Sequence, residues 1–314
     1  MRVFLTGGTG LVGREIIWNL CERGDSAVVL TRNKEQAADR FAKYPDHDNI
    51  ELVQGDPSRA GKWQKFVDGC DAAINLAGEP VFAKRWSKQK KQRLYDSRVD
   101  STNHLVAAIS GASNRPTVLA SASAIGFYGN TGEAEITEDS PAANDDLGKI
   151  CVDWEAAADA ASAHGVRVAK LRIGIVLDEF DGALATMQTP FKLGLGGPIG
   201  RGAMWMSWVH VADVAGVFLK VIDDDEISGP INVVSPNPVR NKDFSKSLAK
   251  ALHRPCLFPV PPFMLKLLYG ESAAIILASQ KVLPRKLEEL DFAFQHSECP
   301  EALKSIFTDD ERTS

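Results

Sequence analysis

The sequence has few cysteines and places them far apart. Cys21, Cys70, Cys151, Cys256 and Cys299 form no CxxC pair and show no metal-ligand spacing. We therefore expect no disulfide and no metal site. The sequence also lacks an apolar stretch long enough to span a bilayer, and it has no basic and apolar leader of the secretory kind. These absences favour a soluble protein of a reducing compartment, which we assign to the cytoplasm.

Basic charge is also scarce. The chain has 36 Lys and Arg against 41 Asp and Glu, a formal net charge of −5, and no long basic run. This mild acidity argues against general nucleic-acid binding. Of the 314 residues, 44% are hydrophobic and 25% are charged. Such values are typical of a globular protein with a sizeable core, as one large domain or a domain with a smaller lobe.

Short apolar runs alternate with longer helical patterns over roughly the first 175 residues. The predicted strands are Arg2–Thr6, Ala27–Thr31, Ile50–Gln54, Ala72–Leu76, Thr117–Ala122 and Arg167–Ile173. The predicted helices are Leu11–Arg23, a long Trp86–Ala112 and Leu147–His164. Strands that alternate with helices predict parallel β-α-β units, and short apolar strands suit a sheet covered on both faces. We therefore expect an α/β fold, a Rossmann-type doubly wound parallel sheet.

The pattern loosens in the second half of the chain. Gly194–Gly202 has five glycines and a proline in nine residues, which excludes a packed helix or strand. The helices expected beyond it are Asp213–Val221, Asn241–Leu252 with Asn241 as N-cap, and Phe263–Tyr269 ended by Gly270. We predict a Rossmann domain over residues 1–230 and a smaller, mostly helical C-terminal lobe over residues 231–314. Segments near residues 178–210 are expected to contribute to the substrate lobe.

A glycine-rich turn joins the first predicted strand to the first predicted helix. The sequence TGGTGLVG at 6–13 spaces Gly7, Gly10 and Gly13 as GxxGxxG. Glycines allow a tight turn and let backbone N–H groups approach a pyrophosphate, while the helix N-terminus adds favourable partial charge. The complete strand–turn–helix context therefore predicts a dinucleotide site. A purely structural turn is the alternative.

The end of the second predicted strand indicates which dinucleotide binds. An NAD-binding fold needs a carboxylate there for the ribose 2′-hydroxyl. The sequence has instead Thr31-Arg32-Asn33-Lys34, with no acid before Glu35. Arg32 is suited to pair with a 2′-phosphate, and Lys34 adds charge. We therefore predict NADP(H) as the cofactor, with a solvated basic loop as the alternative interpretation.

Several further segments carry a family resemblance. They are INLAGEP at 74–80, RW at 85–86, SRVDST at 97–102, SASAIGFYG at 121–129, CVDWE at 151–155, LRIGIVL at 171–177, GLGGPIGRGAMWMSWVHVADV at 194–214 and VVSPNPVRNKDF at 233–244. With the glycine turn, they make the chain similar to the atypical extended short-chain dehydrogenases/reductases. The resemblance is to an NAD-dependent epimerase-like branch that has a C-terminal domain of unknown function. It implies a Rossmann domain with a small substrate lobe and a bound NADP(H).

The resemblance also assigns cofactor-binding positions in this sequence. It implies that the pyrophosphate lies at the glycine turn, the adenosine phosphate at Arg32 and the ribose beside the end of the fourth strand. The residues so assigned are Gly7, Thr9, Gly10, Leu11, Val12, Arg32, Leu76, Ala77 and Gly78. Asp56 matches a residue near the adenine amine, although a cap or turn role fits it equally well. Ser121 is included as a residue beside the cofactor.

The resemblance breaks at the superfamily's working pair, a tyrosine and a lysine four residues later. The tyrosine acts as acid or base, and the lysine lowers its pKa and holds the nicotinamide ribose. Aligned on Trp154 and Glu155, this sequence has Leu147 at the tyrosine position and Cys151 at the lysine position. Leucine has no proton to give. Cys151 is more typical of a small buried side chain than of a nucleophile.

Other residues are candidates for the missing chemistry. Ser121 and Ser123 both follow the fifth strand, where the resemblance places the family's substrate-polarising serine, and of the two we prefer Ser123 for this role. Tyr128 is the tyrosine nearest the site, with a packing role as the alternative. Arg98, Arg172 and His210 are further candidates for the substrate cleft, although a structural hydrogen bond is the commoner role of such a histidine. The segment from Gly194 to Trp208 is either a loop that folds over the substrate or a stiff part of the lobe.

Two functions remain open at this point. The first is an NADP(H)-dependent oxidoreductase or epimerase acting on a small polar or nucleotide-linked substrate, with Ser123, Tyr128 and Arg98 as polarising or proton-handling groups. The second is a catalytically inactive NADP(H)-binding regulatory or scaffold protein, favoured by Leu147 and Cys151. Expected partners are a small-molecule substrate and, optionally, a second copy in a homodimer. Neither nucleic acid nor a membrane is expected.

Overall fold

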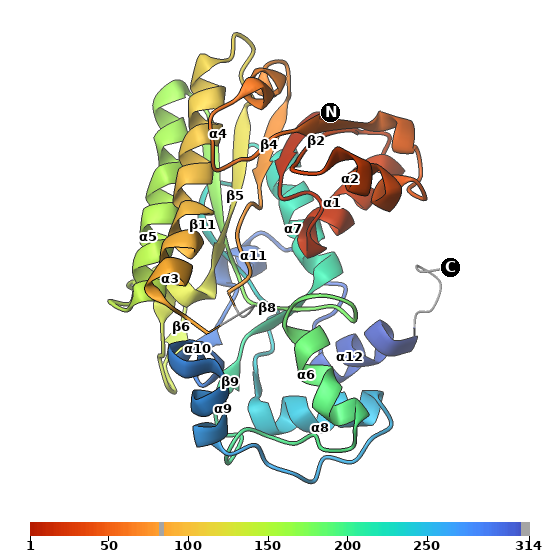
Figure 1. Cartoon of the computed structure of the whole chain (residues 1–314), viewed down its shortest axis with the longest axis vertical. Helices are drawn as coiled ribbons and strands as arrows, with labels where there is room; N and C mark the ends of the chain where they lie inside the picture. The colour runs from red at the N-terminus through yellow and green to blue at the C-terminus, as the bar shows by residue number, and fades with distance from the viewer. Residues whose placement is uncertain (82–84, 309–314) are drawn as a thin grey trace.

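A seven-stranded parallel sheet forms the centre of the computed structural model, which describes residues 1–81 and 85–308 (Figure 1). The strands are β1 (Arg2–Thr6), β2 (Ser26–Thr31), β3 (Ile50–Gln54), β4 (Ala72–Asn75), β5 (Val118–Ala124), β7 (Arg167–Ile173) and β11 (Gly229–Val233). Their order is β3-β2-β1-β4-β5-β7-β11. The chain thus winds outward in both directions from β1, which confirms the predicted Rossmann-type doubly wound fold.

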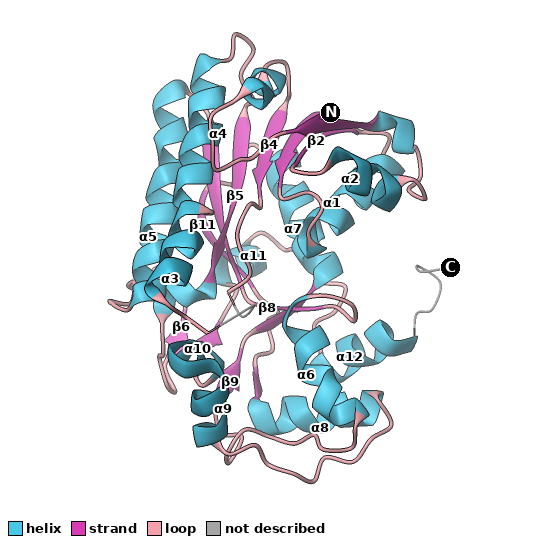
Figure 2. Cartoon of the chain, in the orientation of Figure 1, coloured by secondary structure: helices cyan, strands magenta, loops and turns pink. Residues whose placement is uncertain are grey.

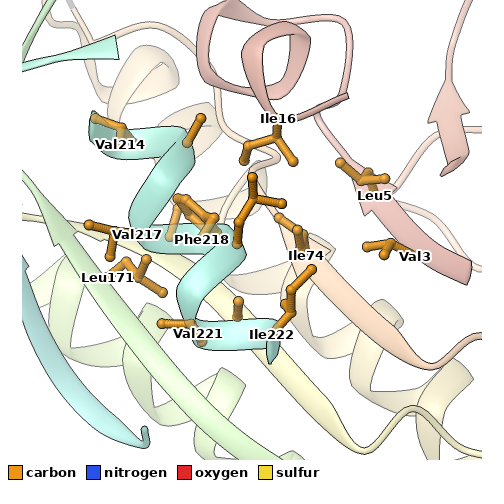
Figure 3. Close-up of a cluster of buried hydrophobic side chains, with 14 of the residues drawn as sticks. Val3, Leu5, Ile16, Ile74, Leu171, Val214, Val217, Phe218, Val221 and Ile222 are labelled. Carbon is orange, nitrogen blue, oxygen red and sulfur yellow. The ribbon is translucent and has the colours of Figure 1, made fainter. Parts of the chain in front are cut away.

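Helices cover both faces of the sheet. Successive residues of a strand point to opposite faces, and the residues on both faces are apolar. Helices α1 (Leu11–Glu22) and α7 (Val211–Asp223) pack together on one face, and α4 (Val99–Gly111) and α5 (Asp146–Asp159) pack together on the other. Val3 and Leu5 belong to the first core, while Phe4 belongs to the second. Figure 3 shows Phe218 of α7 lying over the strands in the first core.

The predicted single helix Trp86–Ala112 is wrong. The structure has α3 (Lys88–Asp96) and α4, separated at Ser97 and Arg98. The Ser97 hydroxyl donates to the Leu94 carbonyl and accepts from the Glu79 N–H, so the break is tied to the loop after β4. This contact between distant segments has no local sequence signal. It places Arg98 at the sheet's carboxyl edge.

The second half of the chain builds most of a lobe (Figure 2), and this lobe has its own hydrophobic core. Its elements are α6 (Gly182–Lys192), α8 (Asn241–Ala251), α9 (Pro262–Tyr269), α10 (Ala273–Ile276) and α12 (Cys299–Thr308), with short strands β6 (Glu135–Ile136), β8 (Ile175–Leu177), β9 (Trp205–Met206), β10 (Trp208–His210), β12 (Val239–Arg240) and β13 (Lys281–Val282). Leu184 and Trp208 share this core with Phe244, so segments on both sides of residue 230 build it. No helix within residues 1–81 and 85–308 is long and apolar enough to cross a membrane.

The boundary between the two parts is less simple than the sequence suggests. Strand β11 spans the predicted boundary at residue 230 and pairs with β7 in the main sheet. Helix α11 (Arg285–Glu289) also returns to that sheet, where Leu287 enters its core. The predicted N-cap at Asn241 is wrong, because Arg240 is the N-cap and the Asn241 side chain accepts from the Ile199 N–H instead. Residues 309–314 of the predicted lobe lie outside the described residues.

Candidate functional site

The loop between β1 and α1 is a tight turn whose shape requires glycine, because a side chain at two of its positions would clash with the backbone. Gly7 has φ +69°, and a Cβ there would lie 2.6 Å from the backbone carbonyl carbon of Leu76. A Cβ at Gly13 would lie 2.6 Å from the carbonyl oxygen of Gly7. The Gly10 N–H closes the loop with a 3.0 Å hydrogen bond to the same oxygen. Helix α1 therefore packs directly on backbone, which only glycine allows at positions 7 and 13.

The N-terminus of α1 has the properties of an anion site. Its N-cap is Gly10, which has no side chain to accept a hydrogen bond, and the first turn contains no acidic residue. The N–H groups of Leu11 and Val12 therefore lack both an intrahelical acceptor and a side-chain cap. Their partial positive charge favours a phosphate. The structure thus brings together Gly7, Gly10, Leu11 and Val12, which were predicted to contact a pyrophosphate.

A pocket of about 380 Å³ lies between this turn and α2 (Lys34–Phe41). Its lining includes Thr9 and Arg32, both predicted, and Arg40. Arg32 is exposed and has no hydrogen-bond or ion-pair partner among the described residues. Arg40 donates through Nη1 to the Thr9 carbonyl at 3.0 Å. Since no carboxylate of the described residues lines the pocket, its chemistry suits a phosphate better than a ribose 2′-hydroxyl.

Neither helix α2 nor Arg40 is among the features predicted from the sequence. The Asn33 side chain caps this helix by accepting from the Gln36 N–H at 3.0 Å. Asparagine followed three residues later by glutamine is a recognised helix-start pattern, so the signal was present. Gln36 and Arg40 are one turn apart on α2, and both line the pocket.

The ends of β3 and β4 complete this edge of the sheet. The N–H groups of Leu76 and Ala77 each donate to Thr6 Oγ1 at 3.2 Å, which fixes the end of β4 beside the glycine turn. This is where the resemblance places the ribose. Asp56 follows β3, and its carboxylate accepts from the Ser58 N–H at 3.0 Å. That bond favours the turn role for Asp56, and its contact with adenine stays a prediction.

Ser121 lies in a buried network beneath the same edge. The Asn75 amide donates to Ser121 Oγ at 3.1 Å and to Thr102 Oγ1 at 2.8 Å. Thr6 Oγ1 in turn donates to Asn75 Oδ1 at 2.7 Å. The Ser121 side chain is buried and supports the strand ends. A direct contact between Ser121 and the cofactor stays a prediction.

Ser123 and Tyr128 belong to one hydrogen-bonded network with three other residues. We call this network the Arg172 cluster, and its members are Ser123, Tyr128, Glu155, Arg172 and Asn232. Arg172 donates from Nε and Nη2 to the two carboxylate oxygens of Glu155, at 2.8 and 2.9 Å. The Ser123 hydroxyl donates to the same carboxylate at 2.7 Å. Arg172 Nη1 donates to Tyr128 Oη at 2.8 Å, and Tyr128 donates to Asn232 Oδ1 at 2.7 Å.

The Arg172 cluster is enclosed and charged. All five side chains are buried, with Arg172 5% and Glu155 6% exposed. Burial alone would lower the pKa of Arg172, but the hydrogen bonds and charge of Glu155, together with the contact with Tyr128, outweigh burial and raise this pKa above its ordinary value. The cluster joins β5, β7, β11, α5 and the 3₁₀ turn Ile125–Tyr128. It therefore holds Ser123 and Tyr128 rigidly at the carboxyl ends of the strands.

The Tyr128 phenol is expected to ionise in the folded protein at about pH 12, above its ordinary value of 10. Burial is the main cause, and the Arg172 charge offsets part of it. Because the folded state holds this proton more tightly, the stability it contributes is complete below pH 10 and is lost as the pH rises toward 12. Titration of the phenolate absorbance in wild type and Tyr128→Phe isolates this transition. A difference transition near neutral pH would contradict the prediction.

No hydrogen bond joins the Arg98 guanidinium to the described side chains of the Arg172 cluster. The Arg98 guanidinium stands against Gly78, where a Cβ would lie 3.2 Å from Cζ, and its Cζ lies 5.3 Å from the centre of the Trp154 ring. Nη1 donates to the carbonyls of Glu79 and Leu94, at 3.1 and 3.3 Å. Arg98 and Gly78 therefore meet beside the end of β4, next to the predicted ribose position.

Two other candidates have structural partners. His210 Nδ1 accepts from the Ala212 N–H at 3.1 Å and so caps α7, while its ring lies 3.9 Å from that of His296. Trp208 is fully buried in the lobe core, and Gly197 lies against the backbone of Phe258. These contacts favour a stiff lobe over a closing loop for the segment from Gly194 to Trp208.

Two protein-family models together match most of the chain. The model of the NAD dependent epimerase/dehydratase family matches residues 3–234. The chain belongs to this family. A second model, a domain of unknown function called DUF1731, matches residues 260–306. Both matches confirm the resemblance described from the sequence, including its C-terminal domain.

Relatives within the epimerase/dehydratase family cover the chain nearly from end to end. An Arabidopsis thaliana epimerase family protein, the SDR39U1 homolog described as chloroplastic, is 40% identical over 98% of this chain and 86% of the relative. Epimerase family protein YfhF of Bacillus subtilis is 36% identical over 98% of this chain and 99% of its own. The crystal structure of human epimerase family protein SDR39U1 with NADPH has a TM-score of 0.83 at 30% identity, covering 98% of this chain and 99% of that one.

Leu147 and Cys151, which the resemblance places at the superfamily's tyrosine and lysine positions, both have apolar packing roles in the structure. A Cβ at Gly126 would lie 2.6 Å from Leu147 Cδ2, so Leu147 packs directly on the 3₁₀ turn after β5. Cys151 is 1% exposed, and burial raises the pKa of its thiol to about 12. The thiol is therefore protonated at neutral pH and is a poor nucleophile, as the sequence predicts.

Proposed function

We propose that the chain is an NADP(H)-dependent oxidoreductase or epimerase that acts on a small polar or nucleotide-linked substrate. The observation that carries the cofactor choice is the pocket beside the glycine turn, with its two arginines and no carboxylate among the described lining residues. The human relative described above was solved with NADPH, which supports the same choice.

The proposal gives each part of the sheet edge a task. The N–H groups of Leu11 and Val12 hold the pyrophosphate at the start of α1. Arg32 pairs with the 2′-phosphate, and Arg40 adds charge while it stays bonded to Thr9. The segment from Leu76 to Gly78 lies along the ribose. The bound nucleotide would supply the hydride, and the chain would bind, orient and polarise.

On the substrate side, the Arg172 cluster is proposed to hold the edge of the site in place. The hydroxyls of Ser123 and Tyr128 both donate to partners inside the protein. Tyr128 is a phenol at neutral pH, so it is available as a proton donor but not as a phenolate base. We keep Ser123 and Tyr128 as proposed polarising groups, reached by the substrate only if it displaces one of these internal bonds.

One observation favours a second function. Leu147 and the protonated Cys151 supply no acid–base pair, which suits an NADP(H)-binding regulatory protein without turnover. Titration with NADPH and NADH, followed by NADPH oxidation against a panel of carbonyl compounds and sugar nucleotides, separates the possibilities. Preferential NADPH binding with turnover of a panel member supports the enzyme, whereas tight binding without turnover supports the regulatory protein. Failure to bind either nucleotide overturns both.

A further inference from the structure

Arg98 has a half-buried guanidinium whose Nε and Nη2 donors make no hydrogen bond with the described residues. Both of its hydrogen bonds come from Nη1 and go to backbone carbonyls, those of Glu79 and Leu94. Within residues 1–81 and 85–308, Nε and Nη2 have no acceptor, and no carboxylate lies within ion-pair distance of the guanidinium. A cation held in a partly desolvated place without a counter-ion is costly for a fold to keep. Such a group is a candidate for binding a ligand.

The position of this guanidinium indicates which ligand it could bind. It lies between Gly78, in the loop after β4, and the face of α5 that carries Trp154. Cys151, one turn earlier on that helix, is close enough for the Arg98 charge to offset part of the effect of burial on the thiol's pKa. The resemblance places Cys151 at the position of the superfamily's lysine. A cation from the α3–α4 break therefore reaches the place that a lysine on α5 would occupy.

We propose that Arg98 replaces the missing lysine and holds the nicotinamide ribose of the cofactor through its free N–H groups. The proposal rests on the NADP(H) binding proposed above and adds a residue to it. Two N–H donors in a rigid fork match the adjacent 2′- and 3′-hydroxyls of a ribose. Gly78 supports this geometry, since a side chain there would stand 3.2 Å from Cζ and crowd the guanidinium. The lysine's cationic role would thus be kept, while its tyrosine partner is absent.

The test compares ligands that have the nicotinamide ribose with a ligand that lacks it. NADPH and 2′-phospho-ADP-ribose carry this sugar, whereas adenosine 2′,5′-bisphosphate does not. Arg98→Met is expected to weaken binding of the first two at least tenfold and to leave the third unchanged. Arg98→Lys is expected to recover part of the loss. Affinities come from calorimetry, with urea unfolding of each variant as a check on folding.

Two controls keep the outcomes distinct. Arg32→Glu is expected to weaken all three ligands, because all carry the 2′-phosphate. Gly78→Ala is expected to reproduce the selective loss without removing the guanidinium, which covers the case of an unfolded Arg98→Met. Equal losses for all three ligands in the Arg98 variants, or no loss for NADPH, would overturn the assignment. If wild type binds none of the three ligands, the proposed function itself has failed.

Discussion

Replacing Arg32 with glutamate is expected to weaken NADPH binding by about 3 kcal/mol, roughly a hundredfold, and to leave NADH binding almost unchanged. Arg32 has no partner among the described residues and lines the pocket at the end of β2. A 2′-phosphate would give it a charge-assisted partner, which a carboxylate at the same position would repel. Titration of protein fluorescence with each reduced nucleotide measures both affinities.

Arg285→Glu provides a matched control for this charge reversal. Arg285 is an exposed arginine at the start of α11 and does not line the pocket, so both affinities should be preserved. Arg40→Glu should also lower NADPH affinity, although the loss includes its bond to Thr9. Equal weakening of NADPH and NADH by Arg32→Glu would show that this arginine shapes the loop instead of choosing the nucleotide.

The cofactor side of the site could be predicted from the sequence because its physics is local. The turn at residues 6–13 combines strand, glycines and helix within one short segment, and Arg32 ends the next strand. Backbone N–H groups at a helix N-terminus need no distant partner to bind a phosphate. The sequence therefore proposes residues for this half of the site, and the structure places Thr9, Gly10 and Arg32 around one pocket, while their contacts with the nucleotide stay predictions. Arg40 could also have been predicted, because the capping residue Asn33 marks the start of the helix that carries it.

The substrate side could not be predicted because its contacts join distant segments. Ser123 and Glu155 are 32 residues apart, and Tyr128 and Asn232 are 104 apart. The sequence singles out Ser123, Tyr128 and Arg172 as polar residues near the cleft, yet nothing in it pairs them with Glu155 or Asn232. The α3–α4 break also depends on a hydrogen bond from the Glu79 N–H to Ser97. The position of Arg98 could therefore not be predicted from the sequence.

Glu155→Gln is expected to lower the free energy of unfolding by about 3 to 5 kcal/mol. The substitution preserves side-chain volume but removes the charge that compensates Arg172, and both residues are almost fully buried. It also places an amide N–H₂ against donors from Arg172 and Ser123. Urea unfolding at neutral pH measures the loss as a lower midpoint with an unchanged slope.

A neighbouring pair and a double variant show whether burial of the charge is the cause. Asp159→Asn, one turn further along α5, breaks a more exposed ion pair with Lys170 and should cost about 1 kcal/mol or less. Glu155→Leu combined with Arg172→Met removes both charges and should be less destabilising than Glu155→Gln alone, because no uncompensated ion remains buried. If Asp159→Asn costs as much as Glu155→Gln, or if the double variant is the least stable, the Arg172 cluster is held together by packing instead of by its ion pair.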